Sequence, residues 1–182
     1  MNYSDLKPSI LARLLEAIAL INNPEVSPEI RQLNQEILFR EVGTAVYNRV
    51  YDMNAFDFEI PHTSGPGIDD RYFGLAKVAS DSVSAGNIGL VEYAKNYVDN
   101  MIGKAQHDAF NNAVQSGKHP TVVRRIVGET CKWCNARAGT YIDPPSEVFQ
   151  RHGGCDCSIT TSGFKTRNGQ LGNYVKPQNR NA

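Results

Sequence analysis

Five side chains of the kinds that bind zinc lie between positions 131 and 157. Cys131 and Cys134 form a C-x-x-C pair, and His152, Cys155 and Cys157 form an H-x-x-C-x-C cluster. All 4 cysteines of the chain belong to this block. A C-x-x-C turn presents two thiolates to one ion, and a second cluster about 20 residues later completes a tetrahedral site with Zn–S distances of about 2.3 Å. We therefore expect a structural Zn²⁺ site, which constrains the fold more than any other feature.

These five candidates compete for the four positions of a tetrahedral shell. Cys131, Cys134 and Cys155 are expected in every arrangement, and either His152 or Cys157 is the fourth ligand. Two disulfides or four reduced core thiols are the alternative interpretations. Disulfide frameworks belong to exported proteins, and the first residues show no export signal, so we expect synthesis in a reducing cytoplasm. A catalytic zinc would need an open position and a nearby base, whereas here the ligands exceed four.

The net charge of zero conceals two halves of opposite sign. Residues 1–116 carry 9 Lys and Arg against 15 Asp and Glu, a net charge of −6, whereas residues 117–182 carry 10 against 4, a net charge of +6. Four thiolates on one Zn²⁺ would reduce the second figure to about +4. Attraction between the halves explains this as well as an outside partner does, and the scattered basic residues make nucleic-acid contact the weaker interpretation.

Helical periodicity dominates the chain up to residue 117. Ser4 is an expected N-cap, and Ser27 followed by Pro28 is a second helix start. Gly117 and Pro120 provide a stop. The pattern predicts helices over residues 5–21, 28–53, 69–79 and 87–115, with a linker or ordered loop at 54–68. No membrane segment is expected, because the most apolar run, 10–21, is too short to span a bilayer and contains two charged residues.

The apolar spacing also predicts which helical residues face inward. On the second helix these are Ile30, Leu33, Ile37, Val42, Val46 and Val50, and on the last they are Leu90, Tyr93, Ala94, Tyr97, Val98, Met101, Ala105 and Phe110. Aromatic residues near the end of the second helix, Tyr47, Tyr51 and Phe56, are candidate anchors for a partner. His107 has no second ligand at helical spacing and is interpreted as a structural histidine.

From Thr121 the pattern is that of β-strands. Residues 121–127 and 157–161 predict two strands that pair as a hairpin-like ribbon, with the two halves of the zinc motif at one end. Such a ribbon is too small to be stable alone, so the metal would hold it together. We predict an α+β, mostly α fold with a helical body at 1–117, a zinc-stapled antiparallel β-ribbon at 118–161 and an extended tail at 162–182.

Other chemistries that use C-x-x-C fit less well. A nucleobase deaminase requires H-x-E upstream and a proline before the first cysteine, where this chain has Thr130. A thioredoxin-like site would not need Cys155 and Cys157. A zinc-dependent nuclease of the His-Asn-His type stays an alternative, although no His-His or Asp-His pair is visible on the preceding strand; Glu147 is its best candidate base. A nucleic-acid-binding module is the third interpretation.

Two segments of the block together resemble a known motif. RIVGETCKWC at 125–134 and VFQRHGGCDC at 148–157 are similar to the C-terminal motif of minor head proteins of tailed phages, in the Mu F-like head-morphogenesis group. In that group a strand ending in T-C-x-x-C is followed by a variable insert, by F-x-x-H-x-x-C-x-C and by another strand. The similarity covers residues 125–161.

This resemblance implies a structural virion component without catalytic activity. It implies incorporation into the phage head near the portal after synthesis in the host cytoplasm, with the portal or major capsid protein as partner. Contact with packaged DNA and oligomer formation are compatible with that role. The helical part of such proteins associates with the portal or the inner capsid, which would assign residues 1–117 to partner contact.

Overall fold

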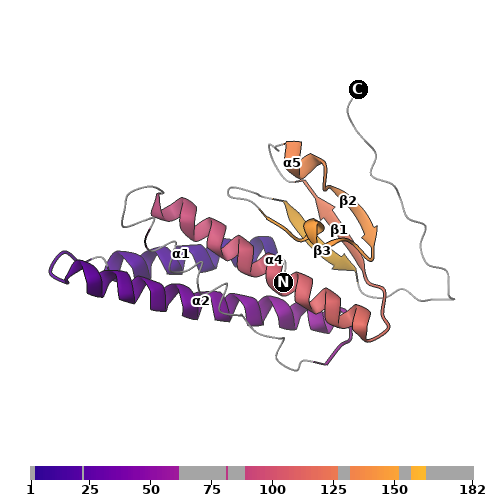
Figure 1. Cartoon of the computed structure of the whole chain (residues 1–182), viewed down its shortest axis with the longest axis horizontal. Helices are drawn as coiled ribbons and strands as arrows, with labels where there is room; N and C mark the ends of the chain where they lie inside the picture. Colours follow the sequence, from indigo (N-terminus) through magenta and orange to yellow (C-terminus); the bar gives the residue numbers. More distant parts are fainter. Residues whose placement is uncertain are drawn as a thin grey trace. The chain divides into compact units, whose positions relative to one another are not determined.

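The computed structural model describes residues 3–21, 23–61, 81, 89–126, 132–151 and 157–162 (Figure 1). Its fold is mostly α with a small antiparallel sheet, which confirms the predicted class. The predicted helix over 69–79 and most of the tail lie outside the described residues. The elements follow the order α1 (Tyr3–Ile21), α2 (Pro28–Asp57), α4 (Leu90–Gln115), β1 (Thr121–Arg125), α5 (Lys132–Asn135), β2 (Gly139–Ile142), the short 3-10 helix η1 (Ser146–Val148) and β3 (Ser158–Ser162).

The chain divides into two compact units. Unit 1 comprises Met1–Arg49, Pro66–Ile102 and Arg151–Gly154, and unit 2 comprises the remaining segments, Val50–Gly65, Gly103–Gln150 and Cys155–Ala182. Helices α2 and α4 contribute residues to both units. The domain boundaries predicted from the sequence, at 117 and 161, stay a prediction.

Of the two N-caps predicted from the sequence, the one at Ser27 is confirmed and the one at Ser4 is not. Helix α2 begins at Pro28 as predicted, and the Ser27 hydroxyl accepts a hydrogen bond from the Ile30 amide at 3.4 Å. Helix α1 begins already at Tyr3, so the prediction of Ser4 as its N-cap was wrong. Serine is tolerated inside a helix at modest cost, which allows the helix to extend past the expected cap.

The same capping motif ends two helices. In α4, the amides of Gly117 and Lys118 bond the carbonyls of Val114 and Ala113, both at 2.9 Å, and Gly117 has φ 75°. This is the Schellman arrangement that the predicted glycine stop requires. Helix α2 ends in the same way at Asp57, with a glutamate in the left-handed position. The predicted loop at 54–68 is therefore wrong for its first four residues.

At the end of α2, Glu59 has a positive φ of 51°. Its amide donates to the Phe56 carbonyl at 3.1 Å, and the Ile60 amide donates to the Ala55 carbonyl at 3.0 Å. The Nζ of Lys118 donates to the carbonyls of Phe58 and Glu59 at 2.8 and 2.6 Å. A lysine three residues beyond the end of α4 thus caps the carbonyl end of α2, within unit 2.

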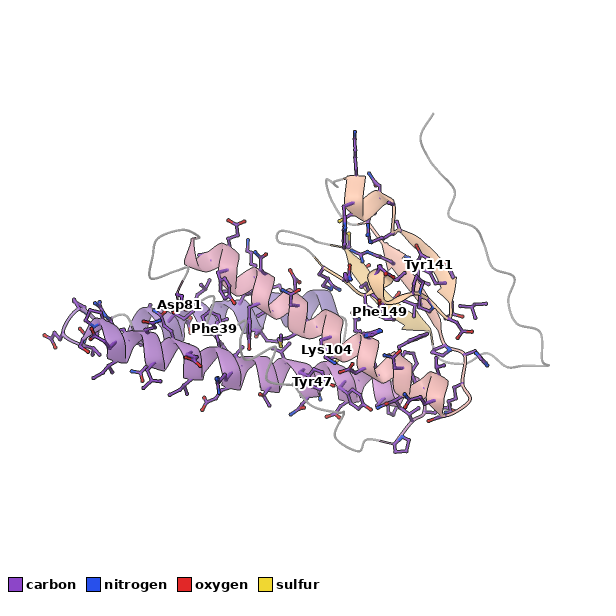
Figure 2. The ribbon with its side chains drawn as sticks, in the orientation of Figure 1. Phe39, Tyr47, Asp81, Lys104, Tyr141 and Phe149 are labelled. Atoms are coloured by element: carbon purple, nitrogen blue, oxygen red, sulfur yellow. The ribbon has the colours of Figure 1, made fainter. Side chains whose placement is uncertain are left out.

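The core of unit 1 is aromatic where α2 and α4 contribute to it. Phe39 of α2 is fully buried and meets Tyr93 and Tyr97 of α4 edge-on, with ring centroids 5.3 and 5.1 Å apart. Figure 2 shows Phe39 on α2. Burial raises the pKa of Tyr97 to about 12, as expected for a phenol that must stay neutral in an apolar site.

Part of the predicted inward face of α2 was wrong. Ile30, Leu33 and Ile37 are 52, 56 and 45% exposed, because the helix instead turns Phe39 inward, onto the tyrosines of α4. The C-terminal part of the prediction holds, since Val46 and Val50 are buried. Two of the proposed aromatic anchors, Tyr47 and Tyr51, are buried as well, and only Phe56, at 73%, is exposed. On α4 the predicted inward residues Ala94, Tyr97, Val98, Met101, Ala105 and Phe110 are all buried.

The sheet in unit 2 has three strands in the order β2-β1-β3, all antiparallel. The predicted pairing of β1 with the strand after the cysteine cluster is confirmed, with Thr121 opposite Ser162 and Arg125 opposite Ser158. Strand β2 was not predicted and pairs with the other edge of β1. Helix α4 contributes Gln106, whose buried amide donates to the Ile159 carbonyl of β3 at 3.0 Å. Among the described helices, none is both long and apolar enough to cross a membrane.

Candidate metal centre

The structure brings together one cysteine from each half of the predicted zinc motif. Cys134 lies on α5 and Cys157 directly precedes β3, and both side chains are buried, at 2 and 3% exposure. They belong to one cluster against which Trp133 packs. The other three predicted ligands, Cys131, His152 and Cys155, lie outside the described residues.

Strand register explains this meeting. Arg125 is the last residue of β1 and is paired with Ser158, the first residue of β3. Because the strands are antiparallel, Cys157 enters the sheet at the end from which β1 leaves toward the C-x-x-C pair. The described cysteine of each half, Cys134 and Cys157, therefore lies at this end of the sheet.

The tryptophan between the two cysteines of the C-x-x-C pair connects the site to the sheet. The guanidinium of Arg137 lies 3.9 Å from the ring centroid of Trp133, and Nη1 of Arg137 donates to the Trp133 carbonyl at 3.2 Å. Tyr141 of β2, labelled in Figure 2, donates from its hydroxyl to the Arg137 carbonyl at 3.0 Å. Cation–π contact and hydrogen bonds thus fix the turn that carries Cys134.

Arg124 is a buried charged residue that organises the site from the middle of the sheet. It is 1% exposed, and its Nη1 donates to the carbonyls of Val148 and Gln150, both at 2.7 Å. Its guanidinium also lies 5.2 Å from the Trp133 ring centroid. The side chain therefore joins β1 both to the first cysteine pair and to the segment that leads into the second ligand cluster.

That segment is held at three points. Phe149 is buried against Phe110 of α4, with ring centroids 5.3 Å apart, and its backbone neighbours are bonded by Arg124. Arg151, the next residue but one, lies in unit 1, where its Nη1 is 3.8 Å from Oδ1 of Asp99. Both of these charged side chains are buried, which makes the pair costly to break. The chain is thus anchored immediately before His152.

His107 of α4 behaves as the structural histidine that the sequence predicts. Its ring lies against Phe149, with centroids 5.4 Å apart, and its Nε2 is 3.3 Å from Nδ2 of Asn111. Burial lowers the pKa of His107 below its usual value, and Lys104 lowers it further, whereas Asp108 and Glu147 raise it. A neutral ring accepts the amide hydrogen at Nε2, so geometry and charge both favour the uncharged form.

A histidine–aspartate pair lies at the opposite end of the sheet. His119 precedes β1 and Asp143 follows β2, and Nδ1 of the histidine is 3.1 Å from the carboxylate. Both side chains are about half exposed, at 54 and 49%. Sequence spacing did not reveal this pair, because its members are brought together only by the pairing of β1 with β2.

Arg124 and Trp133 were likewise missed as parts of the site. A signal for Arg124 existed, since strand alternation places it on the same face as the buried Val122. Within the part of the chain that is described, no three His, Cys, Asp or Glu side chains converge as a metal site would require, and three of the five predicted ligands lie outside that part. No protein-family model, curated protein or solved structure matches the chain.

Proposed function

We propose that one Zn²⁺, bound by Cys131, Cys134, Cys155 and Cys157, holds one end of the three-stranded sheet together. The packing of Cys134 with Cys157 is the observation that carries this proposal. It supports Cys157 over His152 as the fourth ligand, because a buried thiol beside another ligand is in place for the same ion. The donor set is that of a closed structural site, in which the metal supplies cross-links.

The sheet needs such support. Its strands have only 5, 4 and 5 residues. Sheets of this size need packing or a further cross-link to be stable, and metal binding energy is then folding energy. Elemental analysis of protein purified without added metal should give about one zinc per chain. His152→Ala should retain the metal, and Cys157→Ser should lose it. The reverse result would make His152 the fourth ligand in place of Cys157. Wild-type protein without zinc would refute the metal site.

We further propose that the chain is a structural minor head protein of a tailed phage, made in the host cytoplasm and placed in the virion near the portal. The similarity of residues 125–161 to the head-morphogenesis motif supports this role. The anchored and buried character of the described site fits a structural part. The portal or major capsid protein is the expected partner, and contact with packaged DNA is compatible with the basic C-terminal third.

Mass spectrometry of gradient-purified particles tests this role directly. We expect peptides of this chain in the mature head fraction, together with the portal protein. Their presence only in the soluble lysate would contradict a virion role while leaving the zinc site untouched. A salt-dependent gel shift with the purified protein would separately measure DNA contact.

The alternative, a zinc-dependent nuclease, is favoured by one observation, the exposed pair of His119 and Asp143. A histidine oriented by a carboxylate can act as a general base. We expect no cleavage of plasmid DNA with Mg²⁺, Mn²⁺ or Zn²⁺. Cleavage that is lost in His119→Ala but kept in Lys95→Ala, an exposed residue of α4, would replace the structural role with the enzymatic one.

A further inference from the structure

Unit 1 contains an apolar groove between α1 and α2, which lie side by side in Figure 1. Its volume is about 420 Å³. Leu14 and Val46 are buried at its floor, and further apolar residues of both helices line it: Ile10, Leu38, Val42 and Ala45. An apolar hollow of this kind is suited to receive side chains from another helix.

Two arginines complete the lining, Arg13 of α1 and Arg49 of α2. Both are exposed, and within the described part of the chain neither side chain takes part in a hydrogen bond or ion pair. By contrast, Arg40 on the same helix is 2.8 Å from Glu36. No acidic residue is among the described residues that line the groove, although residues 1–116 as a whole carry a net charge of −6. The groove is therefore a basic-edged apolar site in an acidic part of the chain.

We propose that this groove binds an amphipathic helix of a partner protein, with apolar side chains in the groove and carboxylates paired with Arg13 and Arg49. Arginine forms directional, two-pronged bonds with carboxylates and is enriched at interfaces. The chain's own residues 163–182 contain four basic and no acidic residues, so their charge does not complement the two arginines. Binding of such a helix requires neither the metal nor a place in the virion.

A synthetic peptide provides the probe. It is a fluorescein-labelled helix of about 20 residues, with leucines at positions i, i+3, i+4 and i+7 and glutamates on both sides of this stripe. A twin has lysine at every glutamate position. Fluorescence anisotropy with the full-length protein should show saturable binding of the glutamate peptide and clearly weaker binding of the lysine peptide.

Charge reversal in the groove should exchange this preference. In Arg13→Glu/Arg49→Glu, two attractions become repulsions, so the glutamate peptide should bind about tenfold more weakly and the lysine peptide more strongly. Lys95→Glu reverses a charge on the exposed face of α4 and should change neither. Independently, Ala45→Trp should fill the groove and reduce binding of both peptides, whereas Asn48→Trp, at an exposed position on the same helix outside the described groove lining, should not.

Several results would overturn the proposal. Equal binding of the glutamate peptide to wild type, to the charge-reversed protein and to Ala45→Trp would do so, as would no saturable binding. Binding of dodecanoate that Ala45→Trp abolishes, with no peptide binding, would identify a lipid site instead. A concentration-dependent dimer in sedimentation that Ala45→Trp dissociates would identify a second copy as the occupant. If the double charge reversal unfolds the protein, Ala45→Trp and Asn48→Trp still show whether the peptide binds in the groove.

Discussion

The described cores of the two units differ in how they are held together. In unit 1, Phe39 and the tyrosines of α4 pack with aliphatic side chains of the helices, beside the buried ion pair of Arg151 with Asp99. In unit 2, a buried arginine, a tryptophan and two cysteines connect segments that are far apart in sequence. Apolar packing degrades gradually when trimmed, whereas a polar network loses several contacts with one group.

This difference predicts that treatments can affect one unit and spare the other. Each of the following experiments therefore reads out both units, for example by hydrogen exchange resolved to peptides from 28–49 in unit 1 and from 121–150 and 155–162 in unit 2. Effects that spread equally to both would show that the units fold as one cooperative body.

The largest effect is expected from metal removal. Chelation, or Cys134→Ser, should remove about 10 kcal/mol of binding energy or more, because structural zinc sites contribute their binding free energy to folding. We expect strands β1, β2 and β3 to lose protection from hydrogen exchange while 28–49 keeps it. Retained protection in all three strands after complete chelation would contradict the metal-supported sheet. Loss of protection in both units would instead show that the two units are not held together independently.

The second prediction concerns a truncated side chain in the aromatic core of unit 1. Phe39→Ala should destabilise by about 3–5 kcal/mol, because it leaves a cavity beside Tyr93 and Tyr97. Zinc content should stay at the wild-type level. Phe56→Ala, at a 73% exposed position on the same helix, is the matched control and should change stability by less than about 0.5 kcal/mol. Equal effects of the two substitutions would refute the aromatic core.

Arg124 tests the polar network of unit 2. Arg124→Leu removes both hydrogen bonds to the carbonyls of Val148 and Gln150, so we expect a loss of about 3 kcal/mol and weaker zinc retention. The adjacent Arg125 is exposed, and Arg125→Leu should be nearly neutral. If the two leucine variants were equally stable in urea unfolding, the buried arginine would not organise the sheet and the segment before His152.

Gly43 tests the close approach of α2 and α4 in unit 1. A Cβ at this position would lie 2.9 Å from Cζ of Tyr97 and closer still to its hydroxyl. We expect Gly43→Ala to cost about 1–3 kcal/mol despite the better helix propensity of alanine. Tyr97→Phe alone should be nearly neutral, since the buried hydroxyl lacks a hydrogen-bond partner within the described structure. The double variant should recover part of the loss, and strict additivity would exclude direct contact.

The smallest effect is a pH dependence in unit 2. The folded-state pKa of His107 is lowered, so the unfolded chain takes up its proton first as the pH falls. Stability from this group is fully present above about pH 6.5 and is lost as the pH falls toward the folded pKa. The urea midpoint of wild type should therefore drop more than that of His107→Gln between about pH 7.5 and 5.5. The same drop in both proteins would assign the pH dependence to other groups, including metal ligands.

Local chemistry was enough to predict several elements. The Ser27–Pro28 start of α2, the Gly117 stop of α4 and the buried face of α4 follow from capping and helical spacing, because both depend on neighbours within about one turn or on one repeated period. The pairing of β1 with the strand after the cysteine block was also predictable. Glu59 was not predicted to end α2, because a glutamate in the left-handed region carries no sequence signal.

The part of the site that is described was predicted only at its cysteines. The spacing of C-x-x-C and H-x-x-C-x-C indicates which residues can serve one ion, since ligand chemistry is local to the motif. Arg124, the His119–Asp143 pair and strand β2 depend on strand pairing or on contacts more than twenty residues away along the chain. Such contacts are selected by the global packing, which short-range patterns do not record.

The sequence by itself determined the mostly helical class, the C-terminal end of α4, the division of charge and the candidate zinc ligands, because periodicity, capping and thiolate chemistry act over a few residues. The start of α4 was predicted at about residue 87, whereas the helix begins at Leu90. Only the tertiary structure decided which apolar residues of α2 are buried and which line an open groove. It also decided that Arg124 is inside and that Cys134 and Cys157 meet. Burial depends on what the rest of the chain places against a residue, and a helical stripe offers several faces of similar apolar character.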